Sequence, residues 1–250
     1  MVVRKRDENG DYTDLRQCGD YRPLNSFTEL DRYPLPAIED IFQELQGATI
    51  FNKLDLRSGY HQIPLAEKDK CKTAFWGMSR KLWEWNVVPF GLKNAPPIFQ
   101  RMMDRVLAGL PFARCYIDDI VVWSSSFSEN LKHLEIVFDR LRDVGLKVHP
   151  GKCLFGAAKI DFLGHRVTAF GIQPQSDKTA AIKEMVAPKD VPGLRALLGL
   201  FSYYRKFVPH FSAVAAPLNA LLKKDYVWQW EAAEESAMQQ FKLGSSSTPT

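Results

Sequence analysis

The chain has 250 residues, of which 46% are hydrophobic and 25% charged, with a formal net charge of +4. These values argue against a disordered chain and leave room for two or three subdomains, and the small positive charge is compatible with a nucleic-acid partner. The four cysteines are far apart and lack zinc-ligand spacing, so neither a structural zinc site nor a disulfide framework is expected. No apolar run reaches the length of a membrane span, and the N-terminus lacks the apolar core of a secretory signal.

The N-terminal part of the chain predicts a hairpin, a helix and a strand. An Asn-Gly turn signal at residues 9–10 predicts a β-hairpin whose return strand covers 12–21. Apolar residues at helical spacing predict a short helix over 38–45, with Gly47 as its C-terminal cap. The apolar run 50–55 follows as a strand that ends in an isolated carboxylate.

Two amphipathic helices are predicted in the middle of the chain. Residues 63–93 are mixed strand and loop with several aromatic side chains. Asn94 is expected to cap a helix whose apolar stripe covers 98–107. A second amphipathic helix is expected to begin after a cap at Ser128 and to end at Gly145.

The C-terminal part predicts a hairpin followed by helices. Residues 155–167 indicate a strand, a turn and a strand. A long helix is expected from a cap at Asp190 to a stop at Pro209. Arg195 and Lys206 lie about three turns apart along it, so they are expected to share one flank.

An acidic pair at a tight turn is the most informative feature of the chain. Tyr116-Ile117-Asp118-Asp119 lies between two apolar, β-branched runs that predict a strand on each side. Adjacent carboxylates repel each other, and a bound divalent cation commonly offsets the repulsion. Together with Asp55, the pair can form the ligand set of a two-metal phosphoryl-transfer site. Taken alone, such a pair is more often a solvated acidic turn, so its context decides.

That context is a series of motifs in a fixed order. Six motifs occur: DYRPLN at 20–25, LDLRSGYHQ at 54–62, PFGLKNAP at 89–96, YIDD at 116–119, FLGH at 162–165 and LLGLFSYYR at 197–205. Through these motifs the chain resembles the reverse transcriptases of gypsy-type LTR retrotransposons over about residues 2–241. One YxDD motif is a modest signal, but six motifs in order are very specific.

The resemblance implies an α+β right-hand polymerase fold, with fingers, palm and thumb, and a ferredoxin-like antiparallel-sheet palm flanked by helices. The implied parts are fingers over 1–29 and 63–94, palm over 30–62 and 95–172 with the primer grip, thumb over 173–241 and a linker tail over 242–250. The first fingers segment begins later than in the family. We therefore expect an isolated or truncated module of a larger polyprotein, without its protease, ribonuclease H and integrase regions.

The activity implied by the resemblance is RNA-directed and DNA-directed DNA synthesis in reverse transcription of a retrotransposon. Two Mg²⁺ ions, with Mn²⁺ as a substitute, would be held by Asp55, the Leu56 carbonyl, Asp118 and Asp119. One ion would lower the pKa of the primer 3′-hydroxyl, and the other would neutralise charge on the pyrophosphate. Lys152 matches the family's candidate general acid for the pyrophosphate.

Five residues match positions that bind the incoming nucleotide: Lys5, Arg16, Tyr60, Phe90 and Gly91. Lys5 and Arg16 would hold the triphosphate, since arginine offers a fork and lysine a point charge. Tyr60 would exclude a ribose 2′-hydroxyl, and Gly91 would let the backbone approach the template base pair. Without the resemblance, Tyr60 would be assigned to the core and both cations to the surface.

A further set matches residues that contact template and primer: Arg22, Tyr116, Phe162, Leu163, Gly164, His165, Arg195 and Lys206. The FLGH motif corresponds to the primer grip, and the helix with Arg195 corresponds to a thumb that contacts phosphates and sugars. The implied partners are an RNA template, a DNA primer or RNA/DNA hybrid, and deoxynucleoside triphosphates. No membrane partner is expected, and dimerisation stays open. The expected location is intracellular, in cytoplasmic virus-like particles. Nuclear access stays open, because the three basic residues 4–6 are weak evidence for an import patch.

Two other functions stay open. A catalytically dead, nucleic-acid-binding remnant of a retrotransposon polymerase would carry the same motifs. A palm-type nucleotide cyclase also has carboxylates on a hairpin, but it does not account for the motif around Gly91 or the thumb-like helices.

Overall fold

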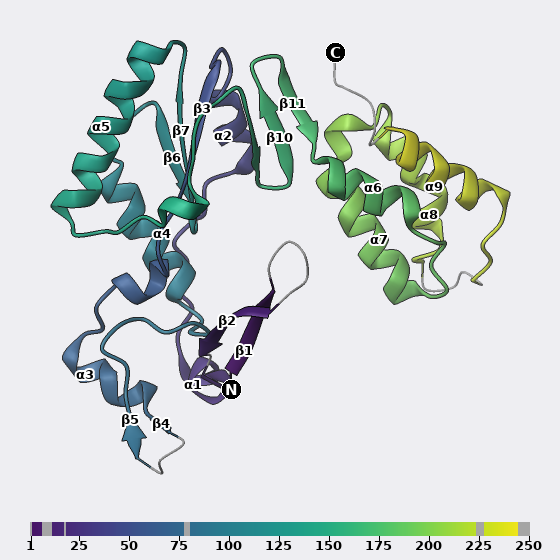
Figure 1. Ribbon diagram of the computed structural model, residues 1–250. Coiled ribbons are helices and arrows are strands. Elements are labelled where there is room, and N and C mark those ends of the chain that lie inside the picture. Colours follow the sequence, from purple (N-terminus) through teal and green to yellow (C-terminus); the bar gives the residue numbers. More distant parts are fainter. Residues whose placement is uncertain (1, 7–11, 18, 78–80, 224–227, 245–250) are drawn as a thin grey trace. The chain divides into compact units, whose positions relative to one another are not determined.

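The computed structural model describes residues 2–6, 12–17, 19–77, 81–223 and 228–244. The chain divides into two compact units, Met1–Ala157 and Ala158–Thr250, which are described separately below (Figure 1). Within the described ranges, no helix is both long enough and apolar enough to cross a membrane.

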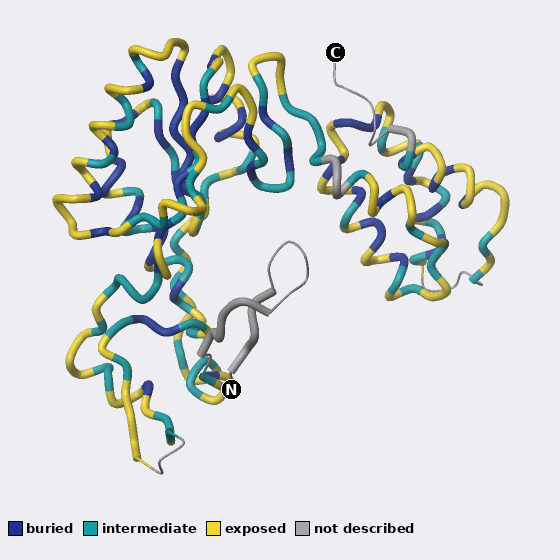
Figure 2. Tube along the Cα trace, in the orientation of Figure 1, coloured by how far each residue is buried: buried dark blue, intermediate teal, exposed yellow. Residues whose placement is uncertain are grey.

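The first unit is built on a four-stranded antiparallel sheet with the strand order β6-β7-β3-β8. Its strands are β3 (Ile50–Asp55), β6 (Ala113–Tyr116), β7 (Asp119–Ser124) and β8 (Leu154–Ala157). β7 is central and buried at five of its six positions, as expected for a strand covered on both faces (Figure 2). This sheet is the ferredoxin-like palm that the motifs imply.

Two amphipathic helices cover the sheet, α4 (Ala95–Val106) against β6 and α5 (Phe127–Asp143) against β7. Their apolar stripes and the strands form one core, which includes Leu54, Phe99, Met103, Ile120, Val137 and Leu141. The predicted cap of α5 at Ser128 is wrong by two residues. Ser126 is the N-cap, because its hydroxyl accepts a hydrogen bond from Glu129 N. Gly145, with φ of 73°, follows the last turn as predicted.

Smaller elements precede and connect these. They are β1 (Val2–Arg6), β2 (Tyr12–Gln17), α1 (Arg22–Phe27), α2 (Ile38–Glu44), η1 (Gly59–Gln62), α3 (Glu67–Lys70), η2 (Cys71–Thr73), β4 (Phe75–Trp76) and β5 (Leu82–Trp83). The hairpin of β1 and β2 is confirmed, although its predicted tip lies outside the described residues. Its return strand does not reach Tyr21, because helix α1 begins at Arg22 with Pro23 in its first turn.

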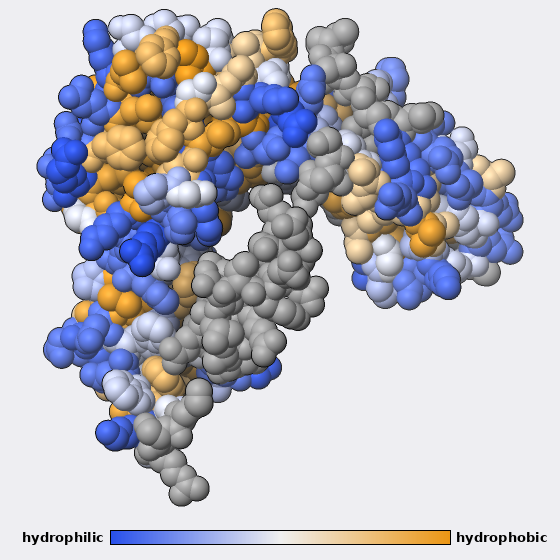
Figure 3. Space-filling view, in the orientation of Figure 1, coloured by the Kyte–Doolittle hydropathy of each residue, from blue (hydrophilic) through white to orange (hydrophobic). Residues whose placement is uncertain are grey.

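Apolar side chains also remain at the surface of this unit. Leu131, Leu154 and Phe155 are about half exposed, and Figure 3 shows hydrophobic surface on the same unit. A folded protein cannot cover its whole surface with polar atoms, so exposure alone assigns these side chains no role.

The second unit combines a three-stranded antiparallel sheet with helices. The strands are β9 (Lys159–Phe162), β10 (His165–Thr168) and β11 (Gly171–Pro174), with β10 in the middle. The helices are α6 (Ser176–Glu184), α7 (Val191–Tyr203), η4 (Arg205–Phe207), α8 (Phe211–Ala220) and α9 (Ala232–Gly244). A single strand was predicted before the turn in residues 155–167. The structure has two strands there, β8 and β9, and they belong to different sheets. The predicted linker tail lies outside the described residues from 245 onward.

The prediction of one long helix that reaches Pro209 is wrong. α7 begins at its Asp190 cap as predicted but ends at Tyr203, and Lys206 belongs to the separate turn η4. Arg195 and Lys206 therefore do not share one helix flank. The break lets Tyr204 and Phe207 both pack around His165, with ring centroids 5.5 and 5.7 Å away. Packing overrides the local helical preference here.

The core of the second unit yields a stability prediction. Phe201 is 3% exposed and stacks on Phe241 with ring centroids 4.3 Å apart. We expect Phe201→Ala to lower the free energy of unfolding by about 3 kcal/mol, because it leaves a cavity. Phe170→Ala is the control, since Phe170 is fully exposed and its loss should change stability by less than about 0.5 kcal/mol. Urea denaturation of both variants checks this, and equal stabilities would contradict the packing.

Candidate active site

Two of the three predicted carboxylates, Asp55 and Asp119, meet across the central strands of the sheet. Asp55, the last residue of β3, pairs directly with Asp119, the first residue of β7. Directly opposite residues place their side chains on the same face, with Cβ atoms about 5 Å apart. Asp118 lies in the two-residue turn that joins Tyr116 to Asp119. The hairpin therefore brings the three carboxylates to one end of the sheet.

Asp118 faces the start of the short helix η1. A Cβ atom placed on Gly59 would lie 3.3 Å from Asp118 Oδ1 and 2.9 Å from a ring carbon of Phe99. Only glycine allows this close approach without a shift of the neighbouring groups. The glycine of the LDLRSGYHQ motif thus brings Tyr60 beside the acidic turn.

Asp119 has a cationic partner to which no motif pointed. Lys53 Nζ lies 3.0 Å from Asp119 Oδ1, and the two side chains are 28% and 31% exposed. Lys53 precedes Asp55 by two residues on a strand, so both side chains lie on the same face. The two-residue spacing of Lys53 and Asp55 was the signal in the sequence that could have placed Lys53 beside the carboxylates.

The donor set fits a hard divalent cation in its chemistry, because all three side chains offer carboxylate oxygens. Among the residues that the structure describes, no three acidic, histidine or cysteine side chains gather into a group that could hold a metal ion. Leu56 is buried and forms a bridge with Val148 at the end of β3. The roles of these residues as ligands stay predictions.

A buried glutamine from α4 holds the acidic turn. Ile117 has φ of 53°, a conformation that β-branched residues rarely adopt. Its N–H donates to Gln100 Oε1 at 2.9 Å, and Gln100 Nε2 donates to the Cys115 carbonyl at 2.8 Å. Gln100 Nε2 also donates to Asp104 Oδ1 at 2.8 Å, and the Gln100 side chain is fully buried. The motifs did not point to Gln100, although a polar residue inside the apolar stripe of α4 was a usable signal.

Two predicted site residues, Phe90 and Asp118, lie near Tyr60. Its ring packs against Phe90, with centroids 5.4 Å apart, and against Phe99 at 5.5 Å. Burial, followed by the charges of Asp118 and Cys115, raises the pKa of Tyr60 to about 12, so its hydroxyl stays neutral. Next to Phe90, Gly91 has φ of 99°, which favours glycine.

Lys152 lies on a turn that is attached to the strand of Asp55. The turn η3 (Pro150–Lys152) follows His149, whose N–H donates to the Asp55 carbonyl at 2.8 Å. Lys152 N–H in turn donates to the His149 carbonyl at 3.0 Å, and the Lys152 side chain is exposed. The structure therefore anchors the Lys152 turn to the acidic end of β3.

The structure does not place the three predicted cations of the N-terminal segment at the acidic end of the sheet. Lys5 and Arg16 lie on β1 and β2, and their side chains are outside the described part of the structure. Arg22 is exposed and binds the carboxylate of Asp20, with nitrogen–oxygen distances of 2.9 and 2.6 Å. These hydrogen bonds lower the pKa of Asp20 to about 2. The roles of all three cations stay predictions.

In the second unit, the FLGH motif forms the turn between β9 and β10. Leu163 and Gly164 both have positive φ, 46° and 69°. The Tyr203 hydroxyl donates to the Leu163 carbonyl at 2.6 Å, and the Tyr204 hydroxyl donates to the Gly164 carbonyl at 3.2 Å. Phe162 and His165 are buried beside the turn, and Arg195 and Lys206 are exposed. The LLGLFSYYR motif thus holds the FLGH turn in place.

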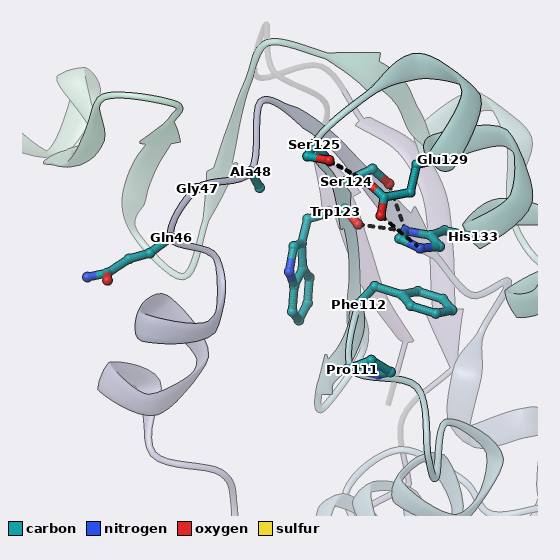
Figure 4. A pocket seen from close by; sticks show the side chains of 10 residues that line it. All are labelled: Gln46, Gly47, Ala48, Pro111, Phe112, Trp123, Ser124, Ser125, Glu129 and His133. Carbon is teal, nitrogen blue, oxygen red and sulfur yellow. Dashed lines mark hydrogen bonds and ion pairs between the residues drawn. The ribbon is translucent and has the colours of Figure 1, made fainter.

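A pocket lies at the opposite end of β7 from the carboxylates (Figure 4). In it, the His133 ring stacks on Phe112 at 3.6 Å, and Ser124 Oγ lies 2.8 Å from His133 Nδ1. Ser124 and Asp119 are five residues apart on one strand, about 16 Å. The pocket is therefore separate from the acidic end of the sheet.

The fold is that of a right-hand polymerase. A foamy viral protease-reverse transcriptase solved with double-stranded DNA matches 97% of this chain and 42% of its own, with a TM-score of 0.86 and 27% identity. A foamy viral protease-reverse transcriptase solved with an RNA/DNA hybrid matches 92% of this chain and 31% of its own, with a TM-score of 0.78 and 27% identity. The predicted fold class is confirmed.

Residues 3–167 match the family model described as "Reverse transcriptase (RNA-dependent DNA polymerase)", and the chain belongs to this family. The Tf2-3 transposon polyprotein of Schizosaccharomyces pombe is 37% identical over 237 residues, and the Tf2-7 polyprotein is 36% identical. Each match covers 94% of this chain but only 18% of the polyprotein. The resemblance to the reverse transcriptases of retrotransposon polyproteins is confirmed.

Proposed function

We propose that this chain is the polymerase module of an LTR retrotransposon and copies RNA and DNA templates into DNA with magnesium. The pairing of Asp55 with Asp119, with Asp118 in the adjoining turn, carries the proposal. Three carboxylates at one end of a central palm sheet suit phosphoryl transfer, in which catalysis depends mainly on positioning and charge.

The proposed roles follow from these positions. Asp55, Asp118, Asp119 and the Leu56 carbonyl would hold two Mg²⁺ ions, or Mn²⁺ in their place. Bound there, the ions would lower the pKa of the primer 3′-hydroxyl and neutralise charge on the leaving pyrophosphate. Lys152 would donate a proton to that pyrophosphate from its turn beside β3.

The proposed partners rest on the similar proteins. Foamy viral reverse transcriptases have been solved with double-stranded DNA and with an RNA/DNA hybrid. We propose the same classes of duplex for this chain, bound mainly through their phosphates, together with deoxynucleoside triphosphates. Action in the cytoplasm, as part of a longer polyprotein, belongs to the same proposal.

Primer extension tests the proposal directly. The purified chain is given a DNA primer on an RNA template, deoxynucleotides and Mg²⁺, and a parallel reaction contains a chelator. Extension that the chelator stops supports the polymerase. Duplex binding without extension would instead favour the catalytically dead remnant, and absence of both would contradict a nucleic-acid role for this chain.

Substitution of Tyr60 tests the proposed discrimination between deoxynucleotides and ribonucleotides. Its neutral ring lies between Phe90 and Phe99, beside the acidic turn. We expect Tyr60→Val to raise ribonucleotide incorporation relative to deoxynucleotide incorporation by about tenfold or more, because the ring no longer blocks a 2′-hydroxyl. Tyr60→Phe keeps the ring and should keep the discrimination. Unchanged discrimination in Tyr60→Val would return Tyr60 to a packing role.

A further inference from the structure

The ion pair between Lys53 and Asp119 lies among the residues proposed to bind metal. Lys53 is opposite Val121 on β7, and Asp119 is two residues away along that strand. On one face of an antiparallel pair, such diagonal neighbours are within reach of a long side chain. The observed distance of 3.0 Å between Lys53 Nζ and Asp119 Oδ1 is therefore a consequence of the strand register.

The surroundings of Lys53 strengthen this pair. Its neighbours across the sheet are Val121 on β7 and Leu154 on β8, and Val121 is fully buried. Both charged side chains are about two-thirds covered. Coulomb attraction at this distance is several times stronger near a partly buried surface than in bulk water. Lys53 is thus more than a solvated surface cation.

We propose that Lys53 is a built-in counter-ion of Asp119 that lowers the affinity of the carboxylate site for divalent cations. This inference rests on the proposed function, since it assumes that the carboxylates bind metal. Three aspartates carry a charge of −3, and Lys53 reduces it to −2. A divalent ion that binds Asp119 must share its carboxylate with the ammonium group or displace it. Lys53 therefore acts on the metal site through Asp119, and Asp55 and Asp118 would hold the metal most directly.

Binding of Mn²⁺ to the chain without nucleic acid tests the proposal. The binding is measured by the electron paramagnetic resonance signal of free Mn²⁺, which requires no catalytic activity. We expect Lys53→Met to bind Mn²⁺ about tenfold more tightly, because it removes the competing charge. Lys53→Arg should keep the wild-type affinity. Lys132→Met, on the exposed surface of α5, removes the same charge elsewhere and should change the affinity by less than about twofold.

A double-mutant cycle separates the direct pair from a general charge effect. Asp119→Asn should weaken Mn²⁺ binding, and Lys53→Met should add little in that background, because the partner is gone. An equal gain in both backgrounds, or no gain in the wild-type background, would overturn the proposal. Circular dichroism melting confirms that each variant folds, and Lys53→Gln replaces Lys53→Met if the latter does not.

Primer extension in parallel keeps this inference distinct from the proposed function. If the wild type does not extend primers but Lys53→Met tightens Mn²⁺ binding, the polymerase proposal fails and the counter-ion stands. If the wild type extends primers and the Mn²⁺ affinity of Lys53→Met is unchanged, only the counter-ion fails.

Discussion

Asp118→Asn is expected to abolish primer extension, with a fall in rate of at least about a thousandfold. Asparagine keeps the shape of the side chain but removes one negative charge from the acidic end of the sheet. Asp118 lies in the turn between β6 and β7, beside Gly59 and the ring of Tyr60. Binding of primer–template should be nearly unchanged, because most of its affinity comes from phosphate contacts.

Single-turnover extension and fluorescence anisotropy of a labelled duplex measure these two effects. Asp139→Asn is the matched control, since it removes the same charge from the exposed surface of α5, where Asp139 pairs with Arg142. It should leave extension unchanged. Retained extension in Asp118→Asn would contradict the assignment of the metal site.

Gln100→Leu is expected to cause the second-largest loss. It leaves the Ile117 N–H and the Cys115 carbonyl without their buried partner, at a cost of about 2 kcal/mol or more in the free energy of unfolding. Ile117 also loses a contact that holds its rare positive φ. Since Asp118 follows directly, its carboxylate should shift, and a shift of about 1 Å can reduce a rate about a hundredfold.

Extension kinetics and urea denaturation together test the role of Gln100. A positioning role predicts a lower kcat with little change in the KM for nucleotide. Gln239→Leu, on the exposed surface of α9, is the control and should change neither quantity. If Gln100→Leu loses stability but keeps the wild-type kcat, Gln100 is a packing residue only.

Much of the fold follows from local patterns in the chain. The helical spacing of apolar residues predicted α4 and α5, and the Asp190 cap predicted the start of α7. Such signals are local, because a cap or an apolar stripe depends on residues within one or two turns. The end of α7 was predicted wrongly, because it depends on the packing of Tyr204 and Phe207 around His165, about 40 residues away.

In the candidate site, too, some features follow from short segments of the chain and others depend on the folded structure. The order of motifs was sufficient to identify the family and to predict the three aspartates as its metal ligands, since each motif is a short contiguous segment. The partners of those aspartates depend on strand register and helix packing between distant segments. Lys53 reaches Asp119 because β3 pairs with β7 in one register, and Gln100 reaches Ile117 because α4 packs beside β6. A one-residue slip would reverse which side chains share a face, so only the folded sheet assigns these contacts.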